Sequence, residues 1–453
     1  MRTAGRLQAA IEVLDLILTR HATAAGALSD WGKAHRFAGA GDRAAIGNLV
    51  YDALRRRLSV AHAMGGDSPR GLAIGAAPGA WDLAPAAVAD LCDGVEHAPA
   101  PLDERERAGL LVGAPEPAPP HVAANIPEWL WPELSTRFGE GALAEGEALA
   151  RRAPLDLRVN TLKASPDKVL AALASFGATA TPHAPLGIRI APPTGGGRTP
   201  NVQVEAGFQK GWFEVQDEGS QIAATIAAAI AKDHGQVLDL CAGAGGKTLA
   251  MAAALANKGQ IHATDADRVR LAPIHERLKR AGVHNVQVHA PRSAGLEALA
   301  GRIGTVIIDA PCTGTGVWRR RPEAKWRLSA EALQRRLAEQ REILDQAVGF
   351  LKPGGAIVYI TCSLLRAENE DQVTELMSRH SGFAARPGAA LWEMACPGGA
   401  PEAVHCGDLG LTLCGQTAID KRMQLGLGDR GGGREGGRRW AIGTHRVLRN
   451  AFI

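Results

Sequence analysis

The stretch that decides the fold is Asp239-Leu-Cys-Ala-Gly-Ala-Gly-Gly-Lys-Thr248. Apolar residues lead into the glycines and a segment rich in Ala and Leu follows, which predicts a strand, a turn and a helix. The turn does not match a phosphate loop, because the first glycine of that motif would fall at Cys241. It does not match a dinucleotide-binding fingerprint either, because Thr248 stands where the third glycine belongs. The glycines still let the backbone approach a ligand closely, although such a turn can also be purely structural.

Further strands alternate with helices on both sides of this turn. Apolar runs at 260–264, 305–308 and 356–360 end at Asp265, Asp309 and Thr361-Cys362, and residues 329–350 have a helical pattern. Buried strands joined by helices predict an α/β, Rossmann-like, mostly parallel sheet over residues 211–413. The polar residues then lie at the carboxyl ends of the strands, where such sheets bind ligands.

The rest of the chain divides into three parts. Apolar residues recur every three or four positions near the N-terminus, which predicts an all-α domain over residues 1–140. Residues 150–208 alternate apolar and polar positions around a short helix, which predicts a small α+β module. Residues 414–453 are polar and end in a Gly/Arg-rich stretch, so we expect a disordered tail without a recognisable last strand.

Composition excludes several classes of protein. The chain has 453 residues, of which 46% are hydrophobic and 22% charged, which favours two or three globular domains over a disordered chain. No apolar run is long enough to span a membrane and the N-terminus lacks a signal pattern, so we expect a cytoplasmic protein. The seven cysteines show no CxxC spacing and the 14 histidines no HExxH motif, so we expect no disulfide framework and no metal. The net charge of +4 permits nucleic-acid binding without indicating it.

The glycine turn and the acid after the next strand together indicate a nucleoside ligand. The Asp265 carboxylate could accept both hydroxyls of a ribose, as acids at this place do in Rossmann folds. A nucleoside without a pyrophosphate fits, and S-adenosylmethionine is such a cofactor. The predicted cofactor-binding residues are Cys241, Ala242, Gly243, Ala244, Gly245, Gly246, Lys247 and Asp265.

Two cysteines follow neighbouring strands of the predicted sheet, in Asp309-Ala-Pro-Cys312 and Thr361-Cys362-Ser363. A lone cysteine at a strand end is more often structural, but two beside a carboxylate and a glycine turn favour nucleophilic catalysis. Methylation at C5 of a pyrimidine needs this set, because a thiolate adding at C6 makes C5 nucleophilic and a carboxyl group can support the addition. The residues alone do not show which of the two thiols is the nucleophile.

These motifs, with residues 215–221 and 316–326, resemble the RsmB type of the NOL1/NOP2/Sun family, bacterial RNA (cytosine-5) methyltransferases. The resemblance implies a NusB-like RNA-binding domain at 1–140, an RNA-binding module at 150–208 and S-adenosylmethionine as cofactor. It also implies that Cys362 is the nucleophile, that Cys312 acts in product release and that Asp309 contacts the cofactor and orients the base. The expected substrate is a cytidine of 16S ribosomal RNA. A transfer-RNA cytosine-5 methyltransferase and a catalytically inactive assembly factor are the alternatives.

Basic residues crowd after the Pro-Cys motif, beside two tryptophans. We predict RNA contacts for them because cations interleaved with aromatic rings suit a backbone with splayed bases, although a solvated helix face is the alternative. The predicted RNA-binding residues are Arg319, Arg320, Arg321 and Lys325. Residues 288–292 lack the acid that the family has near the adenine, and we expect a monomer.

Overall fold

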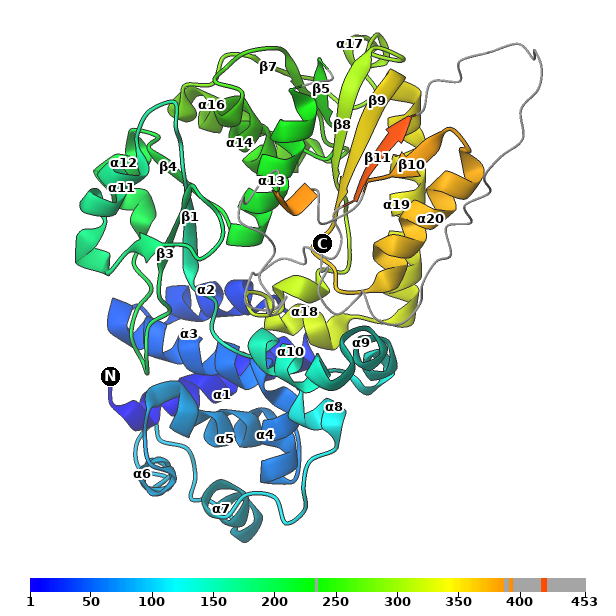
Figure 1. The fold of residues 1–453 in the computed structure, drawn as a ribbon. Coiled ribbons are helices and arrows are strands. Elements are labelled where there is room, and N and C mark those ends of the chain that lie inside the picture. Colours follow the sequence, from blue (N-terminus) through cyan, green and yellow to red (C-terminus); the bar gives the residue numbers. More distant parts are fainter. Residues whose placement is uncertain (233–234, 387–390, 394–416, 422–453) are drawn as a thin grey trace, which may run out of the picture.

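A computed structural model describes residues 1–232, 235–386, 391–393 and 417–421. It contains a helical N-terminal region, a small antiparallel sheet beside it and a large sheet covered by helices (Figure 1). Within the described residues, no helix is both long and apolar enough to cross a membrane.

The N-terminal region is built from helices that share one core. Leu7 and Leu14 of α1, Ile46 and Leu49 of α3 and Leu72 of α5 are fully buried in it, as the spacing of apolar residues predicts. The helices are α1 (Thr3–Thr19), α2 (Ala24–Ala34), α3 (Ala40–Arg55), α4 (Arg57–Met64), α5 (Pro69–Trp81), α6 (Pro85–Asp90), α7 (Glu104–Leu111), α8 (Pro120–Ala123), α9 (Trp131–Phe138) and α10 (Ala142–Leu149).

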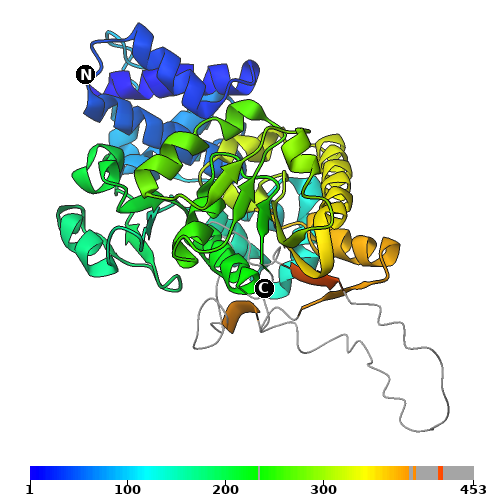
Figure 2. The same ribbon diagram turned by 90° about the horizontal axis from the view of Figure 1, so that it is seen from above.

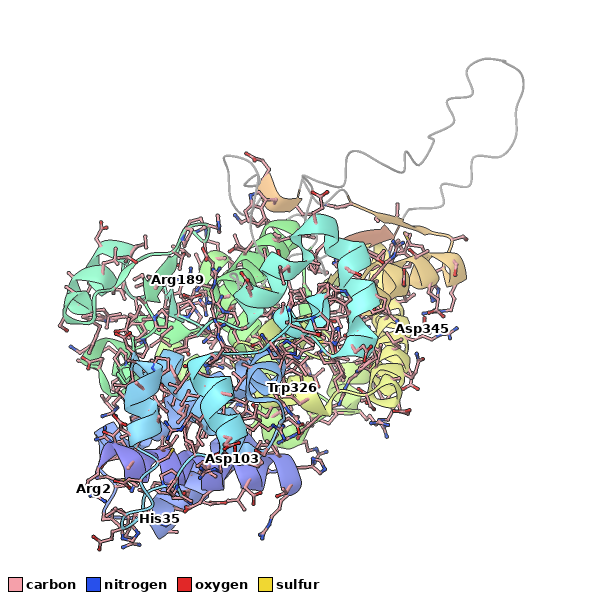
Figure 3. All side chains as sticks on the ribbon, turned by 90° about the horizontal axis from the view of Figure 1, so that it is seen from below. Arg2, His35, Asp103, Arg189, Trp326 and Asp345 are labelled. Atoms are coloured by element: carbon pink, nitrogen blue, oxygen red, sulfur yellow. The ribbon has the colours of Figure 1, made fainter. Side chains whose placement is uncertain are left out.

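The small sheet has the strand order β2-β3-β1-β4, and all its pairs are antiparallel. Arg189 of β3 lies beside two buried acids, with Nε 2.7 Å from Asp156 Oδ1 and Nη2 3.0 Å from Glu218 Oε2 (Figure 3). Because Glu218 begins α13, this network joins the small sheet to the large one. The elements are β1 (Leu155–Val159), α11 (Pro166–Ala172), β2 (Thr179–Ala180), β3 (Gly187–Ile190), α12 (Ala206–Gln209) and β4 (Phe213–Val215).

The large sheet has the order β10-β11-β9-β8-β5-β6-β7. Strands β9, β8, β5, β6 and β7 are parallel, and β11 pairs antiparallel with β9 and β10. The strands are β5 (Val237–Asp239), β6 (Ile261–Ala263), β7 (Val286–Val288), β8 (Ile303–Asp309), β9 (Leu351–Ile360), β10 (Phe383–Ala385) and β11 (Thr417–Lys421).

Helices cover both faces of this sheet (Figures 1 and 2). Ile307 of β8 faces the core formed with α13 and α14, whereas its neighbours Val306 and Ile308 face the core formed with α19 and α20. This confirms the predicted Rossmann-like α/β fold. The helices are α13 (Glu218–Ala231), α14 (Gly246–Ala254), α15 (Arg268–Leu271), α16 (Ile274–Ala281), α17 (Ala294–Glu297), α18 (Pro322–Arg327), α19 (Ala330–Phe350) and α20 (Glu370–Arg379).

The expectation for the C-terminus is wrong at one place. Residues 417–421 form β11, and its backbone pairs with residues 356–359 of β9 and with β10. The sequence Thr417-Ala-Ile-Asp-Lys421 is neither a continuous apolar run nor a strict alternation of apolar and polar residues, and the partner edge that orders it comes from distant parts of the chain. The rest of the predicted tail, 414–416 and 422–453, lies outside the described residues.

Candidate active site

The cofactor loop, residues 240–247, runs from β5 into α14 at the carboxyl edge of the large sheet. Gly243 and Gly245 have φ angles of 50° and 83°, in the left-handed region that favours glycine. A Cβ on Gly245 would lie 2.6 Å from Ile274 Cγ1, so a larger residue would displace α16. Turn geometry and packing therefore require these two glycines, and any binding role of the loop depends on what it faces.

The loop faces Asp265, which follows β6 and is 3% exposed. The backbone N–H of Gly243 donates to Asp265 Oδ2 over 2.8 Å, and that of Asp267 donates to Oδ1 over 2.9 Å. Both carboxylate oxygens are thereby fixed and each keeps acceptor capacity for a ligand hydroxyl. Asp265 lines a cavity of about 420 Å³ together with Cys241 and Pro291. This combination of a fixed acceptor and apolar walls fits the ribose and base of a nucleoside cofactor.

Acidic groups reach this cavity from a different element than the family pattern predicts. Pro291 and Arg292, which follow β7, line it without a carboxylate, as expected from the sequence. Glu339 and Glu342 of α19 also line it. A carboxylate for the exocyclic amine of an adenine is therefore available from α19, which the sequence pattern did not indicate.

Asp309 ends β8 and is held by the lysine of the cofactor loop. Lys247 Nζ lies 2.6 Å from Asp309 Oδ2, and the Asp309 side chain is 42% exposed whereas that of Lys247 is 6% exposed. Lys247 therefore orients the carboxylate and compensates its charge. Behind this pair, Asp239 is buried and accepts a 2.6 Å hydrogen bond from Thr248 Oγ1. Burial raises the pKa of Asp239 to about 7.

The two predicted cysteines lie together. Cys312 Sγ and Cys362 Sγ are 3.2 Å apart. The β8–β9 register places Asp309 opposite Ile360, so the two motifs leave the sheet at the same edge, and the N–H of Gly316 donates to Cys362 O over 2.9 Å. The hydrogen bond to Cys362 and burial together raise the pKa of Cys312 well above its usual value. Cys312 therefore keeps its proton at neutral pH and can donate it to Cys362 Sγ.

Glu368, which the sequence analysis missed, fixes the position of the Pro-Cys loop. It is fully buried, and Oε1 accepts from the Thr313 N–H over 2.8 Å and from Gln340 Nε2 over 3.0 Å. Thr313 Oγ1 also donates to Oε2. Asn369 fixes the other loop, because its Nδ2 donates to Ser363 O over 3.0 Å. Glu368 and Asn369 lie six and seven residues after Cys362. This spacing matches no motif, so these residues could be recognised only from the fold.

The basic segment, residues 318–327, largely forms contacts between the large-sheet region and the helical region. Lys325 is fully buried, and its Nζ donates to Asn125 O over 2.8 Å. Trp326 Nε1 donates to Leu54 O over 2.7 Å (Figure 3). Arg319 is 5% exposed and donates to Arg152 O over 3.1 Å. The side chains of Lys325 and Arg319 are therefore buried and bonded to backbone carbonyls, which does not favour the RNA contacts predicted for these two residues.

Arg320 and Arg321 differ from these two. Arg320 is partly exposed and its Nε donates to Asp217 Oδ2 over 2.8 Å, while Arg321 is exposed. RNA contacts by these two arginines stay a prediction. Among the described residues, no group of three or more His, Cys, Asp or Glu side chains could hold a metal ion.

Two family models match the parts of the chain just described. Residues 227–391 match the family described as 16S rRNA methyltransferase RsmB/F, and residues 126–195 match the ferredoxin-like domain of RsmF/B-like methyltransferases. These matches support the resemblance to the RsmB type of the NOL1/NOP2/Sun family over residues 126–195 and 227–391. The cofactor loop, both cysteine motifs and Glu368 all fall inside the first match.

Curated relatives are named as methyltransferases of the ribosomal RNA of the small subunit. Ribosomal RNA small subunit methyltransferase B of Enterobacter sp. (strain 638) is 36% identical over 263 residues, which are 57% of this chain and 59% of that protein. The probable ribosomal RNA small subunit methyltransferase B of Synechocystis sp. is 30% identical over 293 residues, 63% of each chain. The chain thus spans about three fifths of the length of the curated relatives that it matches.

Solved structures share the fold at low sequence identity. The protein PH0851 aligns with a TM-score of 0.66 at 22% identity, over 93% of this chain and 98% of its own. NSun6 from Pyrococcus horikoshii, solved with SFG, aligns with a TM-score of 0.51 at 22% identity, over 58% of this chain and 89% of its own. These likenesses show the fold. The alignment with PH0851 extends beyond the large sheet, because it covers 93% of this chain.

Proposed function

We propose that this chain transfers a methyl group from S-adenosylmethionine to C5 of a cytidine in RNA, with 16S ribosomal RNA as substrate. The observation that carries the proposal is the thiol pair, Cys312 and Cys362 at 3.2 Å, at the sheet edge that also holds Asp309 and the cofactor loop. The names of the curated relatives and the RsmB/F family description support an RNA of the small ribosomal subunit. NSun6, a structural neighbour, was solved with SFG, an analogue of S-adenosylmethionine, which supports the cofactor.

The cofactor fits the residues that line the cavity. Asp265 would accept the ribose hydroxyls, the glycine loop would contact the amino-acid portion, and Glu339 or Glu342 would accept from the adenine amine. S-adenosylmethionine supplies an electrophilic methyl group on a sulfonium.

The chain's own residues perform the activation of the base. The Cys362 thiolate forms a bond to C6, and the electron pair of the C5–C6 double bond becomes available at C5. Asp309, oriented by Lys247, shares a proton at N3 and stabilises this adduct. After C5 has taken the methyl group, a water molecule takes the C5 proton, the electron pair of the C–H bond re-forms the C5–C6 double bond, and the Cys362 thiolate leaves C6. Cys312, 3.2 Å from Cys362, is positioned to assist this last step.

Trapping the covalent adduct tests the assignment of the two thiols. Wild type, Cys362→Ala and Cys312→Ala are incubated with S-adenosylmethionine and unmodified small-subunit ribosomal RNA, and denaturing gels report protein–RNA adducts. We expect a persistent adduct with Cys312→Ala and none with Cys362→Ala. Cys92→Ala is the matched control, because Cys92 is a buried thiol of the helical region. An adduct in Cys362→Ala would overturn the assignment.

A further inference from the structure

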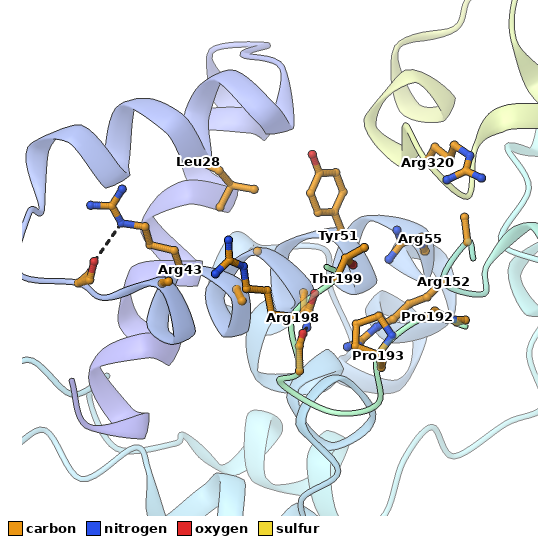
Figure 4. A pocket seen from close by; sticks show the side chains of 17 residues that line it. Leu28, Arg43, Tyr51, Arg55, Arg152, Pro192, Pro193, Arg198, Thr199 and Arg320 are labelled. Atoms are coloured by element: carbon orange, nitrogen blue, oxygen red, sulfur yellow. Dashed lines mark hydrogen bonds between the residues drawn. The ribbon is translucent and has the colours of Figure 1, made fainter. Parts of the chain in front are cut away.

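A groove lined with arginines lies between the helical region, the loop that follows β3 and the basic segment. Its volume is about 840 Å³ (Figure 4). We call it the arginine groove. Its lining includes Arg43, Tyr51, Arg55, Arg152, Arg198 and Arg320. These side chains come from four separate parts of the chain, so the groove exists only in the assembled fold.

Hydrogen bonds fix the loop that follows β3, residues 192–199, which forms one wall of the groove. Asn48 Nδ2 of α3 donates to Gly197 O over 2.8 Å, and Arg152 Nη1 donates to Gly195 O over 2.7 Å and to Pro193 O over 2.9 Å. The loop that carries Arg198 is thereby fastened to the helical region. A surface built in this way is preorganised for a ligand.

The charge of the groove is strongly positive. Arg55 and Arg152 share a single carboxylate, Asp52, with N–O distances of 2.7 and 2.6 Å. Arg43 and Arg198 are exposed. Among the described residues, no Asp or Glu side chain lines the groove. Arg320 is paired with Asp217, so Arg43 and Arg198 are the lining arginines for which no carboxylate partner is seen among the described residues. These two guanidinium groups favour an anion, and arginine suits phosphate in particular because its planar fork can bind two oxygens.

An aromatic ring distinguishes this groove from a site for a small anion. Tyr51 is half-buried and lines the groove, with the Arg55 guanidinium carbon 5.6 Å from its ring centroid (Figure 4). A ring among phosphate-binding groups offers a surface on which a base can stack, which single-stranded nucleic acids use.

The groove also connects to the thiol pair along the chain. Arg320 lies eight residues after Cys312, and the Gly316 N–H between them is bonded to Cys362 O. Arg320 Nη2 also donates to Pro154 O over 2.9 Å, next to the small sheet. Arg320 is therefore the lining residue through which the groove is joined to the Pro-Cys motif along the chain.

We propose that the arginine groove binds the sugar-phosphate backbone of the substrate RNA beside the target cytidine, with Arg43 and Arg198 contacting phosphates and Tyr51 stacking on a base. This inference rests on the proposed function and deepens it. It places RNA contacts between the helical region and the loop that follows β3, which belong to the two parts of the chain that the family resemblance implies bind RNA, in addition to the contacts predicted for Arg320 and Arg321 of the basic segment.

The test combines charge reversal at the exposed rim with a matched control. Arg43→Glu/Arg198→Glu is compared with Arg107→Glu, which reverses an exposed arginine of α7 that does not line the groove. Affinity for unmodified small-subunit ribosomal RNA is measured over a range of salt concentrations, and S-adenosylmethionine affinity is measured in parallel. We expect the double variant to lose roughly tenfold or more in RNA affinity and to lower the salt slope by about 1.5–2. Its cofactor affinity should not change, and Tyr51→Ala should weaken RNA binding without altering the salt slope.

The outcomes separate this proposal from the proposed function. Equal RNA affinity and salt slope in the double variant and in Arg107→Glu, with a methylating wild type, would overturn the groove alone. If the wild type binds RNA more tightly than the double variant but does not methylate it, the proposed function is overturned and the groove proposal is supported. If neither the wild type nor the double variant binds RNA, both the groove proposal and the proposed function are overturned. Inorganic phosphate that displaces RNA far better than chloride at the same ionic strength would indicate a small-anion site and overturn the RNA assignment.

Discussion

The buried ammonium of Lys325 should make the free energy of unfolding depend on pH. Burial lowers the pKa of Lys325 from 10.5 to about 7 in the folded protein. Between pH 7 and 10.5 the unfolded chain therefore binds a proton at this residue that the folded chain does not bind. Stability rises with pH wherever the unfolded state binds more protons, so the contribution of Lys325 increases as pH rises through this window.

The expected magnitude follows from the size of the shift. Each pH unit in the window changes the free energy of unfolding by about 1.4 kcal/mol, which amounts to about 4 kcal/mol between pH 7 and pH 10. Replacing Lys325 with Met removes this titration. It also leaves Asn125 O without its donor, which costs about 1–3 kcal/mol at every pH. The pH-dependent part of the difference therefore belongs to the ammonium and the constant part to the lost hydrogen bond.

Urea unfolding of wild type and Lys325→Met at several pH values between 7 and 10 measures this difference. We expect the stability of wild type relative to the variant to grow by about 1.4 kcal/mol per pH unit. Lys258→Met, at an exposed position, is the control and should show no such growth. A difference that stays constant from pH 7 to 10 would refute the reasoning. The RNA affinity of folded Lys325→Met should equal that of wild type, since the ammonium does not reach solvent.

Two further predictions concern buried acids near the proposed active site. Glu368→Gln should lower kcat by tenfold or more, because Glu368 holds Thr313 and Gln340 in place. It should also speed up alkylation of the thiols, because the charge of Glu368 contributes to the raised pKa of Cys312. Unchanged kcat and an unchanged alkylation rate would contradict this. Asp239 has its pKa raised to about 7, so between pH 4 and 7 the folded state binds the additional proton and stability falls as pH rises. Asp239→Asn should remove this fall, as urea unfolding across that range would measure; a variant whose stability falls as steeply as that of wild type would count against it.

The sequence predicted the large sheet because its signals are local. The glycine turn after Leu240 and the acids after two strands each depend on a few neighbouring residues, and the structure gathers them at one edge. The same local signals placed Cys312 and Cys362 just after two adjacent strands, and in the structure their sulfur atoms lie 3.2 Å apart.

Features that depend on tertiary contacts were predicted poorly. The tryptophans and cations after the Pro-Cys motif suggested a surface for RNA, but Lys325 and Trp326 bond to backbone carbonyls of the helical region. Composition cannot distinguish a joint between domains from a surface, because both can be rich in arginine and tryptophan. Glu368 and the residues of the arginine groove other than Arg320 were missed for the same reason, since their partners lie far away in the sequence.

Mapping the methylated nucleotide tests the central claim most directly. Unmodified small-subunit ribosomal RNA is incubated with S-adenosylmethionine and either wild type or Cys362→Ala, and the product is located by mass spectrometry. The account predicts 5-methylcytidine at one site with wild type and none with the variant. A methyl group on another atom of the RNA, or 5-methylcytidine formed equally well by Cys362→Ala, would contradict it.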